Sequence, residues 1–366
     1  MFMKNFDEIF MKRALTLAEL GRGKTFTNPL VGCVIVKNNL IIGQGWHKKF
    51  GSNHAEINAI ENARQNNFNL EGSTLYVNLE PCSHYGKTPP CALRLVNEKI
   101  SRVVIAMSDP NNLVNGKGIK ILKDAGINVD VGILENEAKY LNRGFIFYHK
   151  YKRPYVLLKI ASSLDGKIAL SNGCSKWITG TQSRIYAHEL RAEYDGILTG
   201  INTILNDNPE LTVRNISGKN PTRIILDANL KIPENSKVLP CVILTGEDSD
   251  KNKISRLEAS GSTIKKLPAQ SGNINLNSAL EYLHSIGILK LMVEGGASVI
   301  GSFLRENLAD EIKIFTAPKI LGEGLNFVSG FKINNMDQAL NLKNIKSRNI
   351  GEDILIEGVF KCSPAL

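Results

Sequence analysis

Two short segments of the sequence hold the residue types that bind a catalytic zinc ion. The first contains His54 and Glu56, and the second contains Cys82 and Cys91. One imidazole and two thiolates make three protein ligands, the number found at catalytic zinc sites that keep a fourth position open. Zinc held in this way lowers the pKa of bound water from about 16 to about 7. The residues therefore predict a hydrolytic zinc centre with His54, Cys82 and Cys91 as ligands.

Glu56 follows His54 by two residues, so the two side chains do not lie on one face of a helix. This spacing suits a carboxylate beside the open metal position better than a fourth ligand. Such a glutamate takes a proton from the attacking water and gives it to the leaving amine. Zinc deaminases combine a His-x-Glu segment, a Pro-Cys segment and a glutamate that is not a ligand. The alternatives are a closed structural zinc site or no metal at all.

Helix-start signals accompany both ligand segments. Ser52 or Asn53 is expected to cap the helix that carries His54, and Thr88 to cap the next ligand helix. With a proline as the first helical residue, Cys91 is expected in the first turn. Helix N-termini favour thiolate over thiol, which assists zinc binding.

Alternating helix and strand patterns before residue 148 predict a layered α/β domain. A polar, basic segment over 148–154 ends in proline and predicts the boundary between domains 1–148 and 154–366. The second domain is also expected to be α/β. Expected helices are 6–20, 55–66, 91–98, 119–125 and 136–147, and expected strands are 31–36, 40–44, 74–79, 102–107, 129–132, 155–161, 196–199, 223–227, 242–245, 289–294 and 311–317.

The bulk composition fits a cytoplasmic enzyme. A length of 366 residues favours two domains, and 43% hydrophobic with 22% charged residues is ordinary for a globular protein. Six cysteines are too few for a disulfide scaffold, and neither a bilayer-spanning apolar run nor a secretory signal is present. The net charge of +10 suits an anionic partner, although its scattered lysines and arginines also fit a solvated surface.

The spacing of the two cysteines departs from the short Pro-Cys-x-x-Cys segment, since eight residues separate them. The insert, Cys-Ser-His-Tyr-Gly-Lys-Thr-Pro-Pro-Cys, resembles the bifunctional deaminase/reductase family of riboflavin biosynthesis. The likeness continues through 27–32 (Thr-Asn-Pro-Leu-Val-Gly), 45–47 (Gly-Trp-His) and 108–111 (Ser-Asp-Pro-Asn). It then covers the second domain, and so spans essentially the whole chain.

For the first domain, the resemblance implies a cytidine-deaminase-like three-layer α/β/α fold. Its implied reaction is hydrolysis of the 2-amino group of 2,5-diamino-6-ribosylamino-4(3H)-pyrimidinone 5′-phosphate, with zinc held as above and Glu56 as proton shuttle. Ordinary turn or solvated-loop roles remain open for the other candidates. The implied substrate-binding residues are Asn28, His47, His84 and Asp109.

For the second domain, the resemblance implies a dihydrofolate-reductase-like α/β fold that reduces the ribosyl group to ribityl with NADPH. The residues offer Glu294-Gly295-Gly296 between an apolar strand and a helix, where backbone N–H groups can approach a phosphate. The glycine pair is equally consistent with a simple tight turn. The absence of Gly-x-Gly-x-x-Gly argues against a Rossmann domain. No side chain here is identified as an acid or a base.

The resemblance carries two residue sets onto this domain. Arg191 and Arg214 suit the 5′-phosphate because guanidinium binds phosphate bidentately, with exposed surface arginines as the alternative. The implied cofactor residues are Ala161, Trp177, Thr203, Asp207, Gly296, Ala297, Ser298, Val299, Ile300, Gly301 and Ser302; the implied substrate residues are Ser175, Arg191, Leu211, Arg214 and Glu294.

Two rival functions stay open at this point. The basic charge and the His-Ala-Glu segment also fit a tRNA-type nucleic-acid deaminase with an accessory domain, which would not bind NADPH. A zinc-stapled binding module is the non-enzyme alternative, and it would unfold when chelated. The family resemblance instead implies a small phosphorylated pyrimidine as partner, no nucleic acid, no membrane, and an assembly larger than a monomer.

Overall fold

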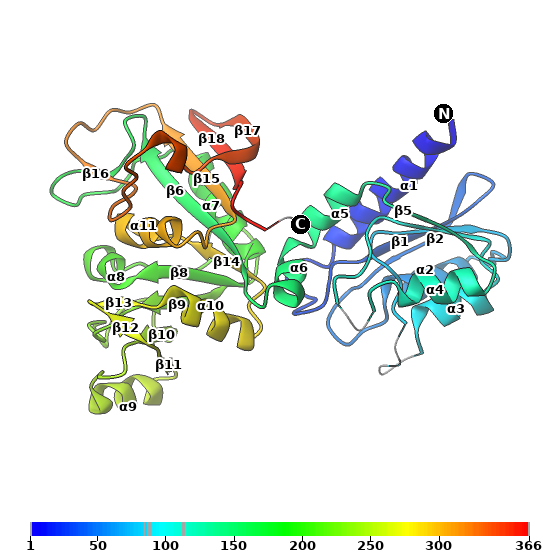
Figure 1. Cartoon of the computed structure of the whole chain (residues 1–366), viewed down its shortest axis with the longest axis horizontal. Helices are drawn as coiled ribbons and strands as arrows, with labels where there is room; N and C mark the ends of the chain where they lie inside the picture. The colour runs from blue at the N-terminus through cyan, green and yellow to red at the C-terminus, as the bar shows by residue number, and fades with distance from the viewer. Residues whose placement is uncertain (1, 84, 86–88, 112–113, 365–366) are drawn as a thin grey trace. The chain divides into compact units, whose positions relative to one another are not determined.

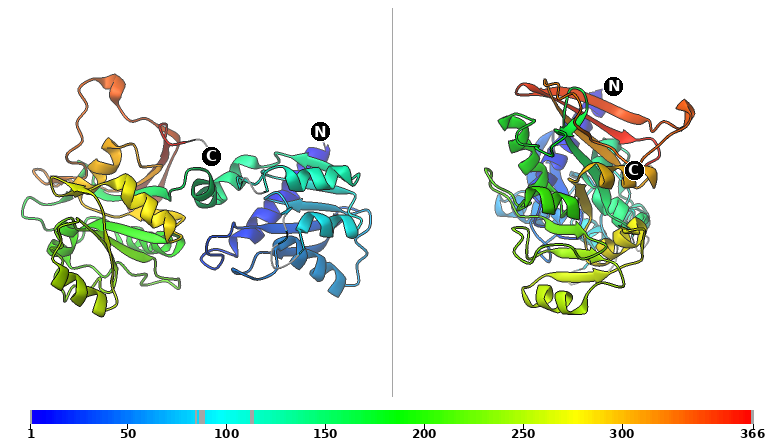
Figure 2. Two further views of the ribbon diagram at one scale, coloured as in Figure 1. Left: turned by 60° about the horizontal axis from the view of Figure 1, so that its bottom comes forward. Right: turned by 90° about the vertical axis from the view of Figure 1, so that its left-hand side faces the viewer.

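The computed structural model divides the chain into two compact units, residues 1–152 and 153–365 (Figure 1). It describes all residues except 1, 84, 86–88, 112–113 and 365–366. Each unit has its own sheet, as the further views in Figure 2 also show, and its own hydrophobic core. The chain thus contains two α/β units, in agreement with the predicted fold class.

The first unit is built on a five-stranded sheet in the order β2-β1-β3-β4-β5. Strand β1 pairs antiparallel with β2 and β3, whereas β3, β4 and β5 run parallel. The carboxyl ends of the parallel strands therefore meet at one edge. The bounds are β1 Gly32–Lys37, β2 Leu40–Trp46, β3 Thr74–Val77, β4 Arg102–Ile105 and β5 Asn128–Val131.

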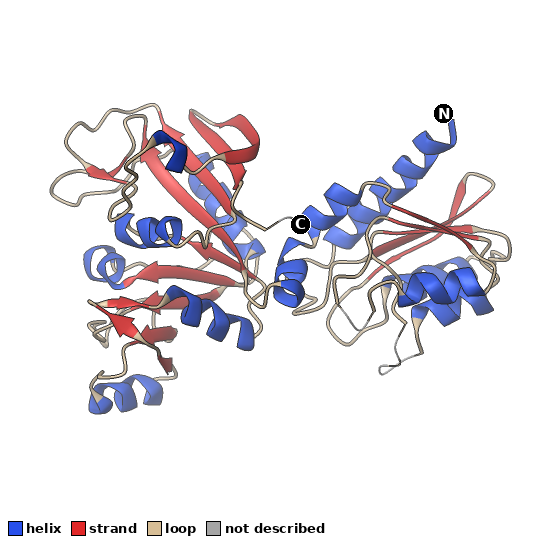
Figure 3. Cartoon of the chain, viewed as in Figure 1, coloured by secondary structure: helices blue, strands red, loops and turns tan. Residues whose placement is uncertain are grey.

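Helices cover both faces of this sheet, which gives the predicted three layers (Figure 3). Cys33 and Ile35 alternate along β1 and join the core beneath the helices on one face. Gly45 lets α2 approach β2, because a Cβ there would lie 2.5 Å from the Ala59 nitrogen. The bounds are α1 Phe2–Glu19, α2 Ala55–Gln65, α3 Cys91–Asn97, α4 Lys117–Asp124 and α5 Glu135–Leu141.

The single closing helix predicted over 136–147 is wrong, because the segment is divided at Asn142 into α5 and α6 (Arg143–Lys150). The Asn142 side chain accepts a hydrogen bond from the Leu30 nitrogen (2.8 Å) and donates one to the Leu30 oxygen (3.0 Å). These contacts tie the break to the loop before β1. Helix α6 also continues to Lys150, so the first three residues of the expected connecting segment are helical.

The second unit is built on a nine-stranded sheet in the order β11-β10-β9-β8-β14-β6-β15-β18-β17. The first seven strands are parallel and the last two pairings are antiparallel. The bounds are β6 Tyr155–Ser163, β8 Gly196–Gly200, β9 Thr222–Leu226, β10 Val242–Thr245, β11 Thr263–Lys266, β14 Lys290–Val293, β15 Glu311–Ala317, β17 Leu342–Ile350 and β18 Asp353–Phe360.

Hydrophobic cores lie on both faces of this second sheet. Val156 and Leu158 of β6 pack in the core formed with α10 and α11, whereas Leu157 packs on the opposite side with α7 and α9. Among the described residues, no helix combines the length and apolarity that crossing a bilayer requires. The bounds are α7 Thr181–Glu193, α8 Ile201–Asp207, α9 Lys251–Ala259, α10 Leu276–Ser285, α11 Ala297–Arg305, β7 Lys167–Ala169, β12 Ala269–Gln270, β13 Asn273–Ile274, β16 Leu325–Asn326 and η1 Met336–Gln338.

Asp310 joins three distant parts of the second unit. Its fully buried carboxylate receives two 2.7 Å hydrogen bonds from Arg153, one of 2.9 Å from the Val156 nitrogen and one of 2.7 Å from the Ser363 hydroxyl. The carboxylate thus fixes the start of β6 and the C-terminal segment against the start of β15.

We expect Asp310→Ala to destabilise the second unit by about 3–5 kcal/mol, because it removes the buried carboxylate that accepts two hydrogen bonds from the largely buried Arg153 guanidinium. Calorimetric unfolding measures the change. The matched control is Glu234→Ala, which breaks the exposed pair with Arg256 and should cost less than about 1 kcal/mol. Equal losses in the two variants would contradict the role given to Asp310.

Candidate zinc centre and cofactor pocket

The three predicted zinc ligands lie together in the first unit. Nδ1 of His54 is 3.3 Å from Sγ of Cys91 and 3.5 Å from Sγ of Cys82, and all three atoms lie within 4.8 Å of one another. Tetrahedral zinc, with bonds of about 2.0 Å to nitrogen and 2.3 Å to sulfur, separates these atoms by about 3.6 Å. The three side chains therefore fit one zinc ion.

Two helix starts and one loop position the ligands. His54 is itself the N-cap of α2 and no side chain caps that helix, so the expected capping by Ser52 or Asn53 is wrong. Cys91 is the first residue of α3, as predicted, and its N–H donates to Sγ of Cys82 (3.2 Å). Thr88, the other expected cap, lies outside the described residues.

Hydrogen bonds among the ligands lower the pKa of one thiol and raise the pKa values of the other thiol and the imidazole. The Cys91 thiol and the His54 imidazole donate to Sγ of Cys82, and these bonds lower the pKa of the Cys82 thiol. The same contact raises the pKa of His54 to about 9. The pair therefore holds a proton that a bound zinc ion would displace.

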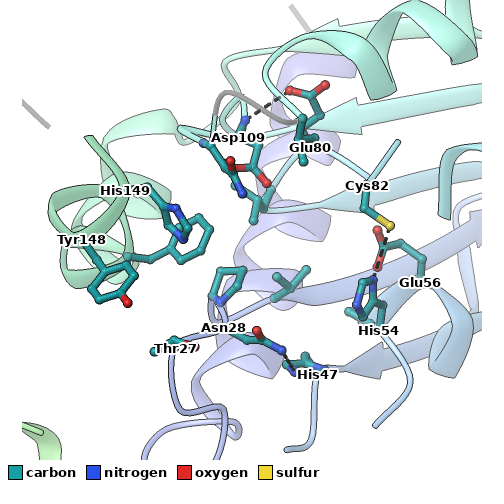
Figure 4. Close-up of a pocket in the computed structure, with 17 residues that line it drawn as sticks. Thr27, Asn28, His47, His54, Glu56, Glu80, Cys82, Asp109, Tyr148 and His149 are labelled. Carbon is teal, nitrogen blue, oxygen red and sulfur yellow. Dashed lines mark hydrogen bonds between the residues drawn. The ribbon is translucent and has the colours of Figure 1, made fainter. Parts of the chain in front are cut away.

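Glu56 is buried beside the ligand cluster, and it lines a cavity that His54 and Cys82 also line (Figure 4). Burial raises the pKa of its carboxyl group to about 6. A carboxylate with a pKa near neutrality both accepts and returns a proton efficiently. Its place next to the ligands, rather than among them, fits the proton-transfer role expected from the sequence.

The cavity has a volume of about 270 Å³ and brings Asn28, His47 and Asp109 together with two of the zinc ligands, His54 and Cys82. His47 donates from Nδ1 to the Asn53 oxygen (3.2 Å) and accepts at Nε2 from the Asn28 amide (3.1 Å), and burial lowers its pKa. These partners hold His47 as the neutral tautomer. Burial also raises the pKa of Asp109 to about 6. His84 lies outside the described residues.

Glu80 is a lining residue that the sequence reasoning missed. Its buried carboxylate accepts hydrogen bonds from the backbone nitrogens of Asp109 (3.2 Å), Gly116 (2.9 Å), Gly118 (2.9 Å) and Ile119 (3.2 Å). It thereby holds the loop of Asp109 against the ligand segment. The approach is close, because a Cβ at Gly118 would lie 2.0 Å from the Pro81 oxygen.

Helix α6 supplies a further side of the cavity through Phe145, Tyr148 and His149. Figure 4 labels the last two of these residues. The sequence reasoning assigned two of these residues to a connecting segment. Their i, i+3, i+4 spacing is typical of one helix face, and this signal could have identified them. The lining of the cavity thus extends beyond the closing helix expected from the sequence.

A charged cluster lies in the second unit at the end of β14. The Glu294 carboxylate accepts hydrogen bonds from Arg191 (3.0 and 3.1 Å) and from Nζ of Lys159 (3.0 Å). Burial by itself would raise the pKa of Glu294, but the two cations hold it well below its usual range. Lys159 was not predicted, although a lysine inside an apolar strand could have indicated it.

The other substrate candidates have ordinary surroundings. Arg214 is half-exposed and pairs with Glu210 (2.8 Å), while its backbone nitrogen donates to His188 (3.1 Å). Leu211 is buried with a positive φ of 54°. Ser175 lies half-buried between β7 and α7. Only Arg191 and Glu294 of this set are joined by a hydrogen bond among the described residues.

A second cavity, of about 280 Å³, lies in this unit at the start of α11 and brings together part of the predicted cofactor set. Residues of the set that do not line it are Ala161, Trp177, Asp207, Ala297, Ile300 and Gly301, of which Ile300 and Gly301 are buried. Residues that line it are Thr203, Gly296, Ser298, Val299 and Ser302.

The glycine pair at this cavity fits a phosphate group. A Cβ at Gly296 would meet only Thr203 Oγ1, at 3.8 Å, so the backbone N–H groups before α11 can be approached closely. Nearby, the Thr199 hydroxyl is buried without a hydrogen-bond partner among the described residues, 3.7 Å from the position of a Cβ at Gly295. A helix N-terminus of this form binds anions.

Comparison with known proteins agrees with this geometry. The family model of the cytidine and deoxycytidylate deaminase zinc-binding region matches residues 4–107, and that of the RibD C-terminal domain matches residues 154–356. The riboflavin biosynthesis protein RibD of Aquifex aeolicus is 43% identical over 360 residues, which cover 97% of this chain and 98% of that protein. The RibD protein of Bacillus amyloliquefaciens is 42% identical over 363 residues, covering 97% and 96%.

Solved structures show the same likeness over both units. The Thermotoga maritima diaminohydroxyphosphoribosylaminopyrimidine deaminase/5-amino-6-(5-phosphoribosylamino)uracil reductase has a TM-score of 0.85 and 37% identity, covering 98% of this chain and 99% of that one. Acinetobacter baumannii RibD (form 1) has a TM-score of 0.87 and 38% identity, with the same coverage. The first unit is accordingly cytidine-deaminase-like and the second has the dihydrofolate-reductase-like RibD fold. The chain belongs to the RibD family of riboflavin biosynthesis proteins.

Proposed function

We propose that the first unit hydrolyses the 2-amino group of 2,5-diamino-6-ribosylamino-4(3H)-pyrimidinone 5′-phosphate, and that the second reduces the ribosyl group of the product with NADPH. The observation that carries the proposal is the buried Glu56 beside three zinc-binding side chains, in a chain that also has a RibD reductase domain. Because the second unit matches a RibD reductase domain, we prefer this function to the alternative of a tRNA-type deaminase with an accessory domain.

In the first unit, His54, Cys82 and Cys91 would hold zinc, a Lewis acid that makes a water molecule acidic near neutral pH. The Glu56 carboxylate takes the proton of that water and delivers it to the leaving amine. Asn28, His47 and Asp109 bind the pyrimidine, since their side chains line the cavity beside the ligands. The neutral His47 offers the substrate no positive charge, which suits an uncharged ring.

In the second unit, NADPH would lie along Thr203 and the Gly296–Ser302 segment, and it supplies the hydride when bound. Arg191 acts through Glu294, because its donors are engaged by that carboxylate and by the Thr212 oxygen. Arg214 keeps a half-exposed guanidinium, which suits the 5′-phosphate of the substrate. Ser175 and Leu211 are the remaining proposed substrate contacts.

Location and assembly are also part of the proposal. We place the enzyme in the cytoplasm, as the likeness to curated riboflavin biosynthesis proteins supports. We further propose an assembly of more than one chain, with small molecules rather than nucleic acid as partners. Light scattering of the purified chain measures the assembly directly.

Glu56→Gln should retain about one zinc per chain and lose ammonia release by about 10²-fold or more, because an amide cannot carry the proton. Zinc is measured by atomic absorption and ammonia by a coupled assay. The control is Glu61→Gln, an exposed position on the same helix. Ammonia release at the parental rate in Glu56→Gln would show that another group moves the proton.

Cys82→Ala should lower the zinc content well below one per chain, since it removes one of only three ligands. The exposed Cys174→Ala in the second unit is the control and should leave zinc unchanged. Metal analysis after gel filtration gives the result directly. A full zinc complement in Cys82→Ala would contradict the ligand assignment.

Glu294→Gln should reduce NADPH oxidation by about tenfold or more while deamination continues, because the buried cations lose their charged partner. Arg214→Ala should raise the KM of the reduction step for the phosphorylated substrate. Arg256→Ala, an exposed arginine elsewhere in the unit, is the control. If either reductase variant lost deamination as well while remaining folded, the two sites would not act separately.

A further inference from the structure

The segment between α8 and β9 carries two proposed substrate residues, Leu211 and Arg214, but forms neither helix nor strand over 208–221. Leu211 has a positive φ of 54°, a conformation that residues other than glycine seldom adopt. Backbone of this kind persists only where the surrounding structure holds it in place. The position of Arg214 therefore depends on contacts from outside the segment.

Helix α7 supplies these contacts from one of its faces. Nδ1 of His188 accepts a hydrogen bond from the backbone nitrogen of Arg214 (3.1 Å). Arg191 follows three residues later, on the same face, and donates to the Thr212 oxygen (3.0 Å). Two side chains of α7 thus hold the backbone of the segment at two points.

His188 is in the protonation state that this contact requires. A backbone N–H can donate to Nδ1 only when that nitrogen carries no proton, as in the neutral ring with its proton on Nε2. Burial lowers the pKa of His188, and the guanidinium groups of Arg191 and Arg214 lower it further, against a smaller opposite effect of Glu294. The ring is therefore neutral near pH 7, and Nδ1 is an acceptor.

His188 holds the backbone of Arg214 and leaves the side chain to other partners. The imidazole is only 7% exposed, whereas the Arg214 guanidinium is half-exposed and pairs with Glu210 of its own segment (2.8 Å). A phosphate can compete with an exposed carboxylate for a guanidinium, because both are bound bidentately. The buried ring thus determines where the exposed cation begins.

We propose that His188 is a positioning residue of the reductase site, which sets the backbone of Arg214 so that its guanidinium meets the 5′-phosphate of the substrate. The inference rests on the proposed function of the second unit. Loss of the acceptor would leave the Arg214 N–H without its partner, and the segment would shift to satisfy it. Substrate binding should then weaken while the hydride step continues.

The first test measures NADPH oxidation by the full chain, with the deaminated pyrimidine phosphate as the varied substrate. His188→Ala should raise the KM for this substrate by about tenfold and change kcat by less than about threefold. The KM for NADPH should stay at the parental value. His188→Asn should restore most of the affinity, since its amide oxygen can take the place of Nδ1. His284→Ala, which removes the other histidine of the second unit, is the control.

The second test asks whether His188 acts through Arg214. The double variant His188→Ala/Arg214→Ala should have a KM within about twofold of that of Arg214→Ala alone, because the first change has nothing left to misplace. His284→Ala combined with Arg214→Ala gives the reference for an unrelated site.

Four results would overturn the inference. A parental KM in His188→Ala would show that the hydrogen bond does not matter for binding. A fall in kcat without a rise in KM would place His188 in the hydride step, and fully additive changes in the double variant would mean that it acts elsewhere. Equal losses in His188→Asn and His188→Ala would exclude the acceptor role. A parental chain that oxidises no NADPH with this substrate would instead overturn the proposed function, and the inference with it.

Discussion

The first unit depends on the convergence of one nitrogen and two sulfurs that belong to separate parts of the chain. His54 begins α2, Cys91 begins α3 and Cys82 lies in the segment after β3, yet their ligand atoms lie within 4.8 Å. The distance is set by backbone packing: glycine at position 45 brings α2 onto the sheet, and the Glu80 carboxylate holds the ligand segment against α4. A change in these packing contacts would therefore move the ligand atoms even when the three ligand residues themselves are unchanged.

The second unit contains an ionised carboxylate, Glu294, between two cations. Glu294 stays ionised although it is largely buried, because Lys159 and Arg191 contact it and outweigh the cost of removing most of a carboxylate from water. The nearby glycine pair is uncharged and attracts anions through backbone N–H groups instead. Fixed charges and backbone dipoles therefore lie next to each other in this unit, at Glu294 and at the glycines that follow it.

The zinc ligands and both sheets could be predicted because each follows from local sequence: ligand spacing, helix starts and alternating apolar strands. Strands β10 and β15 have the predicted bounds, whereas β17 and β18 were not expected. Strand β17 is largely exposed and lacks apolar alternation. Glu80 and Lys159 were missed because their partners lie far away in sequence. The break at Asn142 depends on a contact with Leu30, which helical periodicity does not reveal.

The division of the closing segment into α5 and α6 sets a lower limit on the length of an independent deaminase fragment. A fragment cut where the apolar helix pattern ends, at residue 147, would lose Tyr148 and His149 from the side of the cavity formed by α6. Fragments and fusions of RibD-type chains should therefore be joined after Lys150 rather than within the basic stretch. The last helix of the first unit belongs to its cavity as well as to its connection with the rest of the chain.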